Sequence, residues 1–326
     1  MATPNIYWPV YKNLEKEVLK LADFLHFSDD QTSVYSMHIA DLIIRCAVEI
    51  EAIAKELYSS LGGNVSPVDA NGNARDLYFD TDCLDLLEQS WNIGKKQVTV
   101  SSINFYFTDE KNRVLTPLHK ANKRGTSGSK WKQAYQAVKH DRRNSLKKGN
   151  IENLLNALGA LFILNVYYRD ESFSLGRISS AGSFDSRLGS DIFSVFVAHA
   201  EKIPVGNEVS DDDIESAVKN ELEHSIYVQK YKDESFRKIH KEIVTANLNA
   251  VNKLIKSQKV IEFIKNNSGY TITNAIQLAR DAGGDALVKE ISSAMHLAHG
   301  FAEAYYEVIL YKGHQIYPTL TKEDAL

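Results

Sequence analysis

Apolar residues recur every three to four positions along most of this chain, the spacing that places them on one face of an α-helix. Polar residues that favour helix N-termini stand before several of these stretches, at Asp29-Asp30, Thr81 and Asn150. The pattern therefore predicts a mainly α protein. The helices that it predicts cover residues 11–27, 31–61, 81–91, 131–146, 150–168, 214–231, 235–266 and 286–311.

Two short segments, 96–107 and 192–200, instead alternate apolar and polar residues, which predicts strands. From residue 170 to 189 the composition turns to Ser, Gly and Arg, as at a seam between two parts of a chain. We therefore predict a helical bundle with a small β insertion over residues 1–170. A second region, residues 171–326, begins with the strand-containing seam and continues as helices.

The bulk composition is that of a globular protein, with 326 residues, 44% hydrophobic and 25% charged. Both cysteines, Cys46 and Cys83, fall within apolar helical patterns, which predicts buried free thiols of a reducing compartment. Residues 1–8 lack the basic start and the apolar run of a signal peptide. The longest apolar stretch, 154–168, is interrupted by asparagines and is too short to span a bilayer. These features predict a cytoplasmic protein without a membrane partner.

Positive charge is concentrated in one segment of the chain. Residues 111–148 hold twelve Lys and Arg and one acid, Asp141, a local net charge of +11 in a chain whose formal net charge is −4. Such a segment predicts a phosphate-bearing partner. Its Gly- and Ser-rich loop, followed by a helix with aromatic residues, suits single-stranded nucleic acid through phosphate contacts and base stacking. The predicted nucleic-acid-binding residues are Lys123, Arg124, Lys130, Trp131, Lys132, Tyr135 and Lys139.

The helix predicted from Trp131 also carries the best candidates for catalytic chemistry. His140 lies among several cations, which favour its neutral form and suit it to act as a general acid or base. Arg142 and Arg143 follow it and suit bidentate contact with a phosphate. A solvated basic helix face without a catalytic role is the alternative interpretation.

A polar line runs along the otherwise apolar helix predicted over residues 31–61. His38, Asp41, Arg45 and Glu49 follow one another at spacings of three and four and so share one face. One interpretation is a ladder of ion pairs at a partly solvated edge. The other is the polar lining of a cleft between helices, in which Arg45 and Glu49 orient the catalytic groups.

The sequence Trp131-Lys-Gln-Ala-Tyr-Gln-Ala-Val-Lys-His-Asp-Arg142, followed by the apolar helix that begins after Asn150, resembles a segment of the HEPN-like group of helical bundle proteins of prokaryotes. With the earlier helix that carries Arg45 and Glu49, the resemblance covers roughly residues 31–168. It implies a homodimeric helical bundle that acts on RNA in stress or phage defence.

HEPN-like ribonucleases usually carry an Arg followed four to six residues later by a His, at the mouth of a dimer cleft. No Arg precedes His140 at that distance. Arg113 and His119 do have the spacing, but Pro117 lies between them in a predicted loop, and we treat this match as coincidence. The arginine partner of a catalytic His140 would then come from Arg45, Arg142, Arg143 or a second subunit.

The resulting prediction is an RNA-binding protein, or one that binds another phosphate-bearing ligand, with metal-independent ribonuclease activity as its potential function and no cofactor. The competing prediction is a non-catalytic dimerising module whose basic segment binds an acidic protein partner. A third hypothesis, a metal site, would use the line of His296, His299, Glu303 and Glu307. Because no second helix offers the matching Glu-x-x-His pattern, we prefer a polar interface stripe there and predict no metal.

Overall fold

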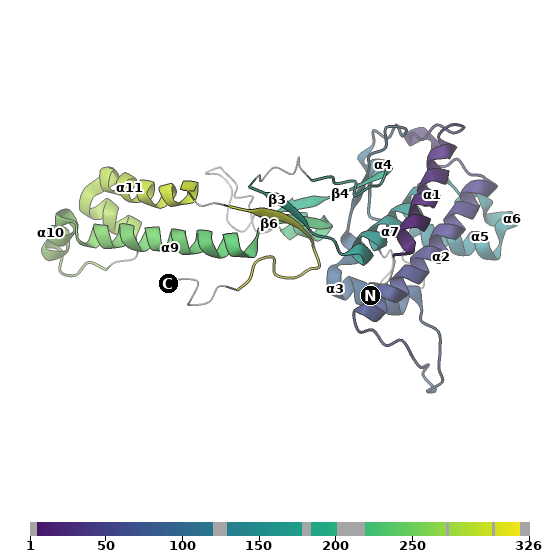
Figure 1. The fold of residues 1–326 in the computed structure, drawn as a ribbon, viewed down its shortest axis with the longest axis horizontal. Helices are drawn as coiled ribbons and strands as arrows, with labels where there is room; N and C mark the ends of the chain where they lie inside the picture. The colour runs from purple at the N-terminus through teal and green to yellow at the C-terminus, as the bar shows by residue number, and fades with distance from the viewer. Residues whose placement is uncertain are drawn as a thin grey trace. The chain divides into compact units, whose positions relative to one another are not determined.

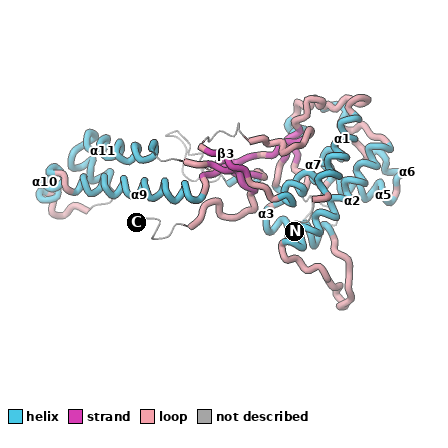
Figure 2. The backbone as a smooth tube through the Cα atoms, in the orientation of Figure 1, coloured by secondary structure: helices cyan, strands magenta, loops and turns pink. Residues whose placement is uncertain are grey.

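The computed structural model describes residues 5–119, 129–177, 184–200, 219–271, 274–301 and 304–319 (Figure 1). Its helices are α1 (Tyr7–Leu21), η1 (Asp29–Gln31), α2 (Met37–Ser60), η2 (Phe79–Cys83), α3 (Leu84–Trp91), η3 (Ile93–Lys95), α4 (Glu110–Arg113), α5 (Lys130–His140), α6 (Arg142–Ser145), η4 (Leu146–Lys148), α7 (Ile151–Arg169), α9 (Asp233–Ile255), α10 (Gln258–Asn266) and α11 (Ala275–Phe301). Its strands are β1 (Val98–Val100), β2 (Val114–Leu115), β3 (Phe173–Gly176), β4 (Phe193–Val195), β5 (Val197–His199), β6 (Tyr227–Tyr231) and β7 (Tyr306–Leu310). Helices predominate, which confirms the mainly α prediction (Figure 2).

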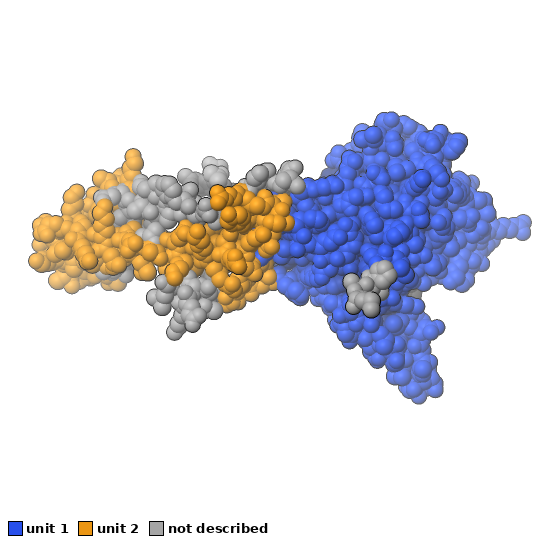
Figure 3. Space-filling view, viewed as in Figure 1, with its two compact units in different colours: residues 1–173, 181–230, 308–314 blue, residues 174–180, 231–307, 315–326 orange. Residues whose placement is uncertain are grey.

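The chain divides into two compact units (Figure 3). Unit 1 comprises Met1–Phe173, Ala181–Lys230 and Val308–His314, and unit 2 comprises Ser174–Ser180, Tyr231–Glu307 and Gln315–Leu326. The predicted division between residues 170 and 171 does not coincide with this one, because two later segments join unit 1. Only tertiary contacts place those segments there, and no shift in composition marks them.

The core of unit 1 is built around α7, which packs against α1, α2 and α5 (Figure 1). Its predicted N-cap is confirmed, because the side chain of Asn150 accepts a hydrogen bond from Asn153 N at 3.0 Å. Among the described residues, α7 is the one helix long and apolar enough to cross a membrane, but 83% of its most apolar window is buried inside the protein. A helix that is apolar on nearly every side is stable in a folded protein only when neighbouring elements cover all of its faces.

The start of α2 differs from the prediction. Ser36, and not Asp29-Asp30, is its N-cap, since the Ser36 hydroxyl accepts a hydrogen bond from Ile39 N at 3.1 Å. Asp29 instead lies in η1 and accepts hydrogen bonds from residues about eighty positions later in the chain. Thr81 is likewise not a cap, because it lies inside the π-helical turn η2 that runs directly into α3.

The helix predicted over residues 131–146 is interrupted. At Asp141 the backbone leaves the helical region, with φ −144°, and α5 ends at the residue before it. The Asp141 side chain then caps α6 by accepting a hydrogen bond from Asn144 N at 3.3 Å. The hydrogen bond of the Asp141 side chain with the backbone is an alternative to the helical backbone bonds, and the helix is interrupted there. Arg142 and Arg143 therefore do not lie on a continuation of α5.

Strand β1 is only three residues long, whereas the prediction gave residues 96–107. It is the central strand of a small antiparallel sheet in the order β2-β1-β4, in which Val98 pairs with Leu115 on one side and Val195 on the other. Beyond it the chain is loop, with Ile103 85% exposed. The predicted loop after residue 108 contains α4 and β2.

A second sheet has the order β3-β7-β6-β5, with β5 and β6 parallel. Strands β6 and β7 lie where helices were predicted to end, near residues 231 and 311. Both contain Tyr and Val, and β7 also contains Ile, residues that favour strands when a partner strand is available. The helix prediction there is wrong because the partner comes from a distant part of the sequence.

Unit 2 contains α9, α10 and α11. Its core cluster is Ala250, Leu254, Val260, Leu278 and Ala279. The helix predicted over residues 235–266 is divided at Ser257, the N-cap of α10. Helix α11 is kinked at Gly284, whose φ of 63° is readily adopted by glycine alone.

Both cysteines are free and buried, as predicted. Burial raises the pKa of the Cys46 thiol to about 12 and that of the Cys83 thiol to about 11. A thiol with so high a pKa carries little thiolate at neutral pH and is therefore a poor nucleophile.

Candidate ligand-binding cavity

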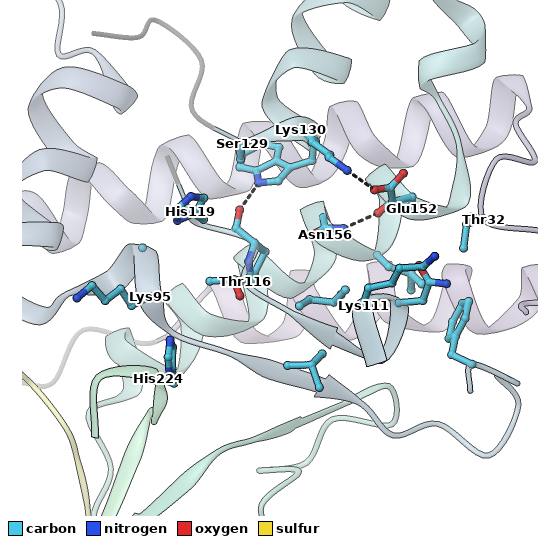
Figure 4. A pocket seen from close by; sticks show the side chains of 18 of the residues that line it. Thr32, Lys95, Lys111, Thr116, His119, Ser129, Lys130, Glu152, Asn156 and His224 are labelled. Carbon is cyan, nitrogen blue, oxygen red and sulfur yellow. Dashed lines mark hydrogen bonds and ion pairs between the residues drawn. The ribbon is translucent and has the colours of Figure 1, made fainter. Parts of the chain in front are cut away.

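Unit 1 contains a cavity of about 710 Å³, a size typical of small-ligand sites (Figure 4). Its walls come from η3, the α4–β2 segment, the first turn of α5, the first turns of α7 and residues 220–224, together with Thr32 after η1 and Phe107. The cavity therefore exists only where several separate parts of the sequence meet. Apolar side chains line it in part, namely Phe107, Val114, Leu115, Pro117, Trp131 and Leu155.

Three lysines from different elements line the cavity, each beside a carboxylate. Lys95 bonds Glu223 at 2.7 Å, and Lys130 bonds Glu152 at 2.9 Å. Lys111 lies 3.3 Å from a carboxylate two residues earlier in the chain. The lysine side chains are 45%, 75% and 76% exposed for Lys95, Lys130 and Lys111. Exposed ion pairs contribute only about 0–1 kcal/mol, so an anionic ligand can replace the carboxylate at little cost.

The polar groups of the cavity differ between its two sides. Figure 4 shows Lys95, His119 and His224 on one side. Glu152 and Asn156 lie on the other, where Asn156 donates from Nδ2 to the Glu152 backbone carbonyl at 2.9 Å. Within the described part of the chain the side-chain oxygen of Asn156 has no hydrogen-bond donor, so it is free to accept one from a ligand.

The first turn of α5 also borders the cavity. Its N-cap, Ser129, makes no side-chain capping bond, and both Ser129 and Lys130 are lining residues. The backbone N–H groups of a first helical turn have no partner within the helix, and together with the helix dipole they give this end a partial positive charge that favours anions. Trp131 holds the turn in place, because its Nε1 donates to the Pro117 carbonyl, in the segment after β2, at 2.8 Å.

Asp29 braces the wall that carries Lys111. Its carboxylate accepts hydrogen bonds from the Asn112 side chain at 2.7 Å and from the Thr108 hydroxyl at 2.7 Å and backbone N–H at 2.8 Å. These bonds, that from Asn112 first, hold the pKa of Asp29 well below its usual value. A carboxylate that accepts several such bonds remains ionised and fixes the loop before α4.

Several predicted nucleic-acid-binding residues are inside the protein. Trp131 and Tyr135 are 1% and 4% exposed, so their rings pack in the core and offer no stacking surface for a base. Lys132 is 3% exposed, forms an ion pair with Glu51, and has its ammonium 4.8 Å from the ring centroid of Phe79. The core contacts of these three residues account for their positions.

The other predicted nucleic-acid-binding residues differ in their accessibility. Lys130 lines the cavity, and Lys139 is exposed with its ammonium 3.3 Å from the Tyr135 hydroxyl. Lys123 and Arg124 lie outside the described residues, although His119 and Ser129, the described residues on either side of their segment, both line the cavity.

The predicted catalytic histidine lies far from the cavity. His140 is exposed at the C-terminal end of α5, whereas the cavity borders the N-terminal end. At 1.5 Å per residue these ends are about 15 Å apart. Arg143 is exposed just beyond His140, and Arg142 pairs with Asp41 of α2 at 3.0 Å.

The charges of Arg45 and Glu49 in α2 act on titratable side chains of α1. Lys20 lowers the pKa of Glu17 in α1, and Arg45 contributes to the same shift. Burial raises the pKa of Tyr7 to about 12, with a smaller contribution from Glu49. Within the described residues no hydrogen bond or ion pair joins His140 to Arg45, Glu49, Arg142 or Arg143, so the structure does not assemble them into one site.

Sequence reasoning missed most of the cavity. Lys95 and His224 stand outside the basic segment, and no local pattern singles them out. His119 lines the cavity, whereas Arg113, which precedes it at the ribonuclease spacing, is not among the lining residues. The available signal for the wall formed by α7 is Asn156, one of three asparagines in this largely apolar helix.

Comparisons with protein-family models, with curated proteins and with solved structures found no match. Among the described residues no group of three or more His, Cys, Asp or Glu side chains is arranged to hold a metal ion. The side chains of His296, His299 and Glu303 lie outside the described part of the structure.

Proposed function

We propose that unit 1 binds RNA, or another phosphate-bearing ligand, in this cavity. The observation that carries the proposal is the convergence of Lys95, Lys111 and Lys130, from three separate elements, on one ligand-sized space. The N-terminal turn of α5 adds its partial positive charge. Phosphate contacts of this kind supply most of the affinity of proteins for nucleic acids.

The HEPN-like resemblance belongs to the same proposal. The packing of α7 against α2 and α5 is compatible with the helical bundle that it implies. From the resemblance we infer a homodimer with a role in stress or phage defence. Ribonuclease activity would use His140 as the acid or base and Arg143 as a phosphate clamp, at the end of α5 away from the cavity.

The test of binding uses labelled single-stranded RNA and full-length protein in EDTA. The triple variant Lys95→Gln, Lys111→Gln, Lys130→Gln should bind RNA more weakly, and the slope of its salt dependence should fall by about one for each lysine that neutralises a phosphate. Lys20→Gln is a matched control, because Lys20 also forms an exposed helical ion pair, with Glu17 at 2.8 Å. Equal weakening in the control, or no RNA binding by wild type at low salt, would contradict the proposal.

The same samples test cleavage. If the protein is a metal-independent ribonuclease, wild type cleaves the RNA in EDTA and His140→Ala binds it without cleaving. Binding without cleavage in both proteins would favour the non-catalytic module. The exposed position of His140 makes the substitution structurally mild, so a loss of activity would not reflect misfolding.

A further inference from the structure

We infer that the cavity takes a single nucleotide, free or at the end of an RNA chain, with its phosphate beside Lys95 and its sugar and base beside Asn156. This inference rests on the proposed function and names the ligand class of the same cavity. It follows from three features of the cavity: its size, the division of its polar groups, and the presence of apolar lining residues.

The size of the cavity limits the ligand. A space of about 710 Å³ suits a ligand of the size of one nucleotide and is too small for a nucleic acid duplex. The affinity expected of a single nucleotide comes from a few placed polar groups together with apolar contact. The cavity offers both, because Phe107 and Leu155 line it together with its polar groups.

The two sides of the cavity differ in the chemistry that they offer. Lys95, His119 and His224 present an ammonium and two imidazoles on one side, all of which can donate hydrogen bonds to phosphate oxygens (Figure 4). The other side presents the Asn156 amide and the Thr32 hydroxyl beside the ion pair of Lys130 with Glu152, and Lys111 lies near them (Figure 4). The amide and the hydroxyl can pair with ribose hydroxyls and base edges. A nucleoside phosphate likewise has its phosphate at one end and the donors and acceptors of its sugar and base at the other.

Before a ligand binds, Glu223 occupies Lys95 in an ion pair. The hydrogen bond from Lys95 lowers the pKa of Glu223, so the carboxylate is ionised at neutral pH and holds the ammonium at the wall. An incoming phosphate must compete with this carboxylate for Lys95. Removing the charge at Glu223 should therefore strengthen phosphate binding, whereas removing the charge at Lys95 should weaken it.

The experiment is calorimetric titration of the full-length protein with four probes: inorganic phosphate, the four nucleosides, their 5′-monophosphates, and a pentanucleotide RNA with or without a 5′-phosphate. Wild type should bind one or more monophosphates more tightly than the matching nucleoside or phosphate alone. Lys95→Gln should weaken monophosphate and phosphate binding about tenfold without affecting the nucleoside. Asn156→Leu should weaken the monophosphate and the nucleoside about tenfold without affecting phosphate.

Two further arms keep the inference falsifiable. Glu223→Gln should bind the monophosphate several-fold more tightly than wild type, a gain that misfolding would not produce. Tighter binding of the 5′-phosphorylated pentanucleotide than of the monophosphate would identify an RNA end as the ligand, and the reverse order a free nucleotide.

The outcomes separate this inference from the proposed function. If both pentanucleotides bind equally well, with or without the 5′-phosphate, and no mononucleotide binds, the inference is wrong and the proposed function stands. If no probe binds, both fail. If Lys95→Gln and Asn156→Leu weaken all probes equally, the assignment of the two sides is wrong.

Discussion

The side-chain nitrogen of Asn112 lies 2.7 Å from a carboxylate oxygen of Asp29, and this hydrogen bond joins two segments 83 residues apart. Through it η1 holds α4, the helix that places Lys111 in the cavity wall. The hydrogen bonds of Asp29 are therefore structural, and they position Lys111, a candidate ligand-binding residue, in the cavity wall.

Asp29→Asn should destabilise the protein in a pH-dependent way. Because hydrogen bonding lowers the folded-state pKa of Asp29 below the unfolded value of about 4, the unfolded state binds more protons at acidic pH. The stabilisation by Asp29 is thus present at neutral pH and is lost as the pH falls below about 4. Urea midpoints at pH 7 and pH 3 should show a difference between wild type and variant that shrinks at the lower pH.

Asp30→Asn is the matched control for this experiment. Asp30 is the next residue in η1, which places its carboxylate in the same turn. A pH-dependent difference of the same size in both variants would mean that the general charge of η1, and not the hydrogen bonds of Asp29, is responsible.

Because of Lys96, the free energy of unfolding should rise with pH between about 7 and about 10.4. Its side chain is buried, donates to the Glu223 carbonyl at 3.0 Å, and lies 4.6 Å from the ring centroid of Tyr311. Burial lowers its pKa to about 7, against about 10.4 for an unfolded chain. Between these values the unfolded state binds the extra proton, so the free energy of unfolding should increase with pH. Urea titrations from pH 6 to 10 should show a steeper rise for wild type than for Lys96→Met.

The ion pair of buried Lys132 with partly exposed Glu51 should behave as a coupled unit in unfolding experiments. Lys132 is 3% exposed and Glu51 is 33% exposed in their side chains. Glu51→Ala leaves a buried ammonium unpaired and should cost about 3 kcal/mol, whereas Lys132→Met leaves a carboxylate that water reaches and should cost less. The double variant should recover much of the loss; additive effects of the two substitutions would argue against a coupled pair.

Trp131→Phe tests the hydrogen bond that joins the cavity walls. It removes the donor to the Pro117 carbonyl, a bond of 2.8 Å in a buried position, and should destabilise the protein by about 1–3 kcal/mol. Trp91→Phe is a matched control, since Trp91 is also buried but its indole nitrogen has no hydrogen bond within the described residues. Equal unfolding free energies for the two variants would show that packing alone accounts for the role of Trp131.

The local parts of the fold could be predicted from the sequence. The apolar pattern of α7 and its cap at Asn150 depend on neighbouring residues alone, and both predictions are confirmed. Strands β6 and β7 could not be predicted in the same way, because the hydrogen bonds of a strand are made with residues far away in the sequence. A helix makes its hydrogen bonds within its own segment.

The residues of the candidate site could likewise be predicted from the sequence only in part. The sequence alone determined that positive charge gathers in residues 111–148 and that Lys130 belongs to it. Only the tertiary structure decided that Lys132 is buried against Glu51 while Lys130 opens to a cavity that Lys95 also lines. The reason is physical: charge is a property of composition, whereas exposure and ion pairing depend on which distant side chains the fold brings within a few ångströms.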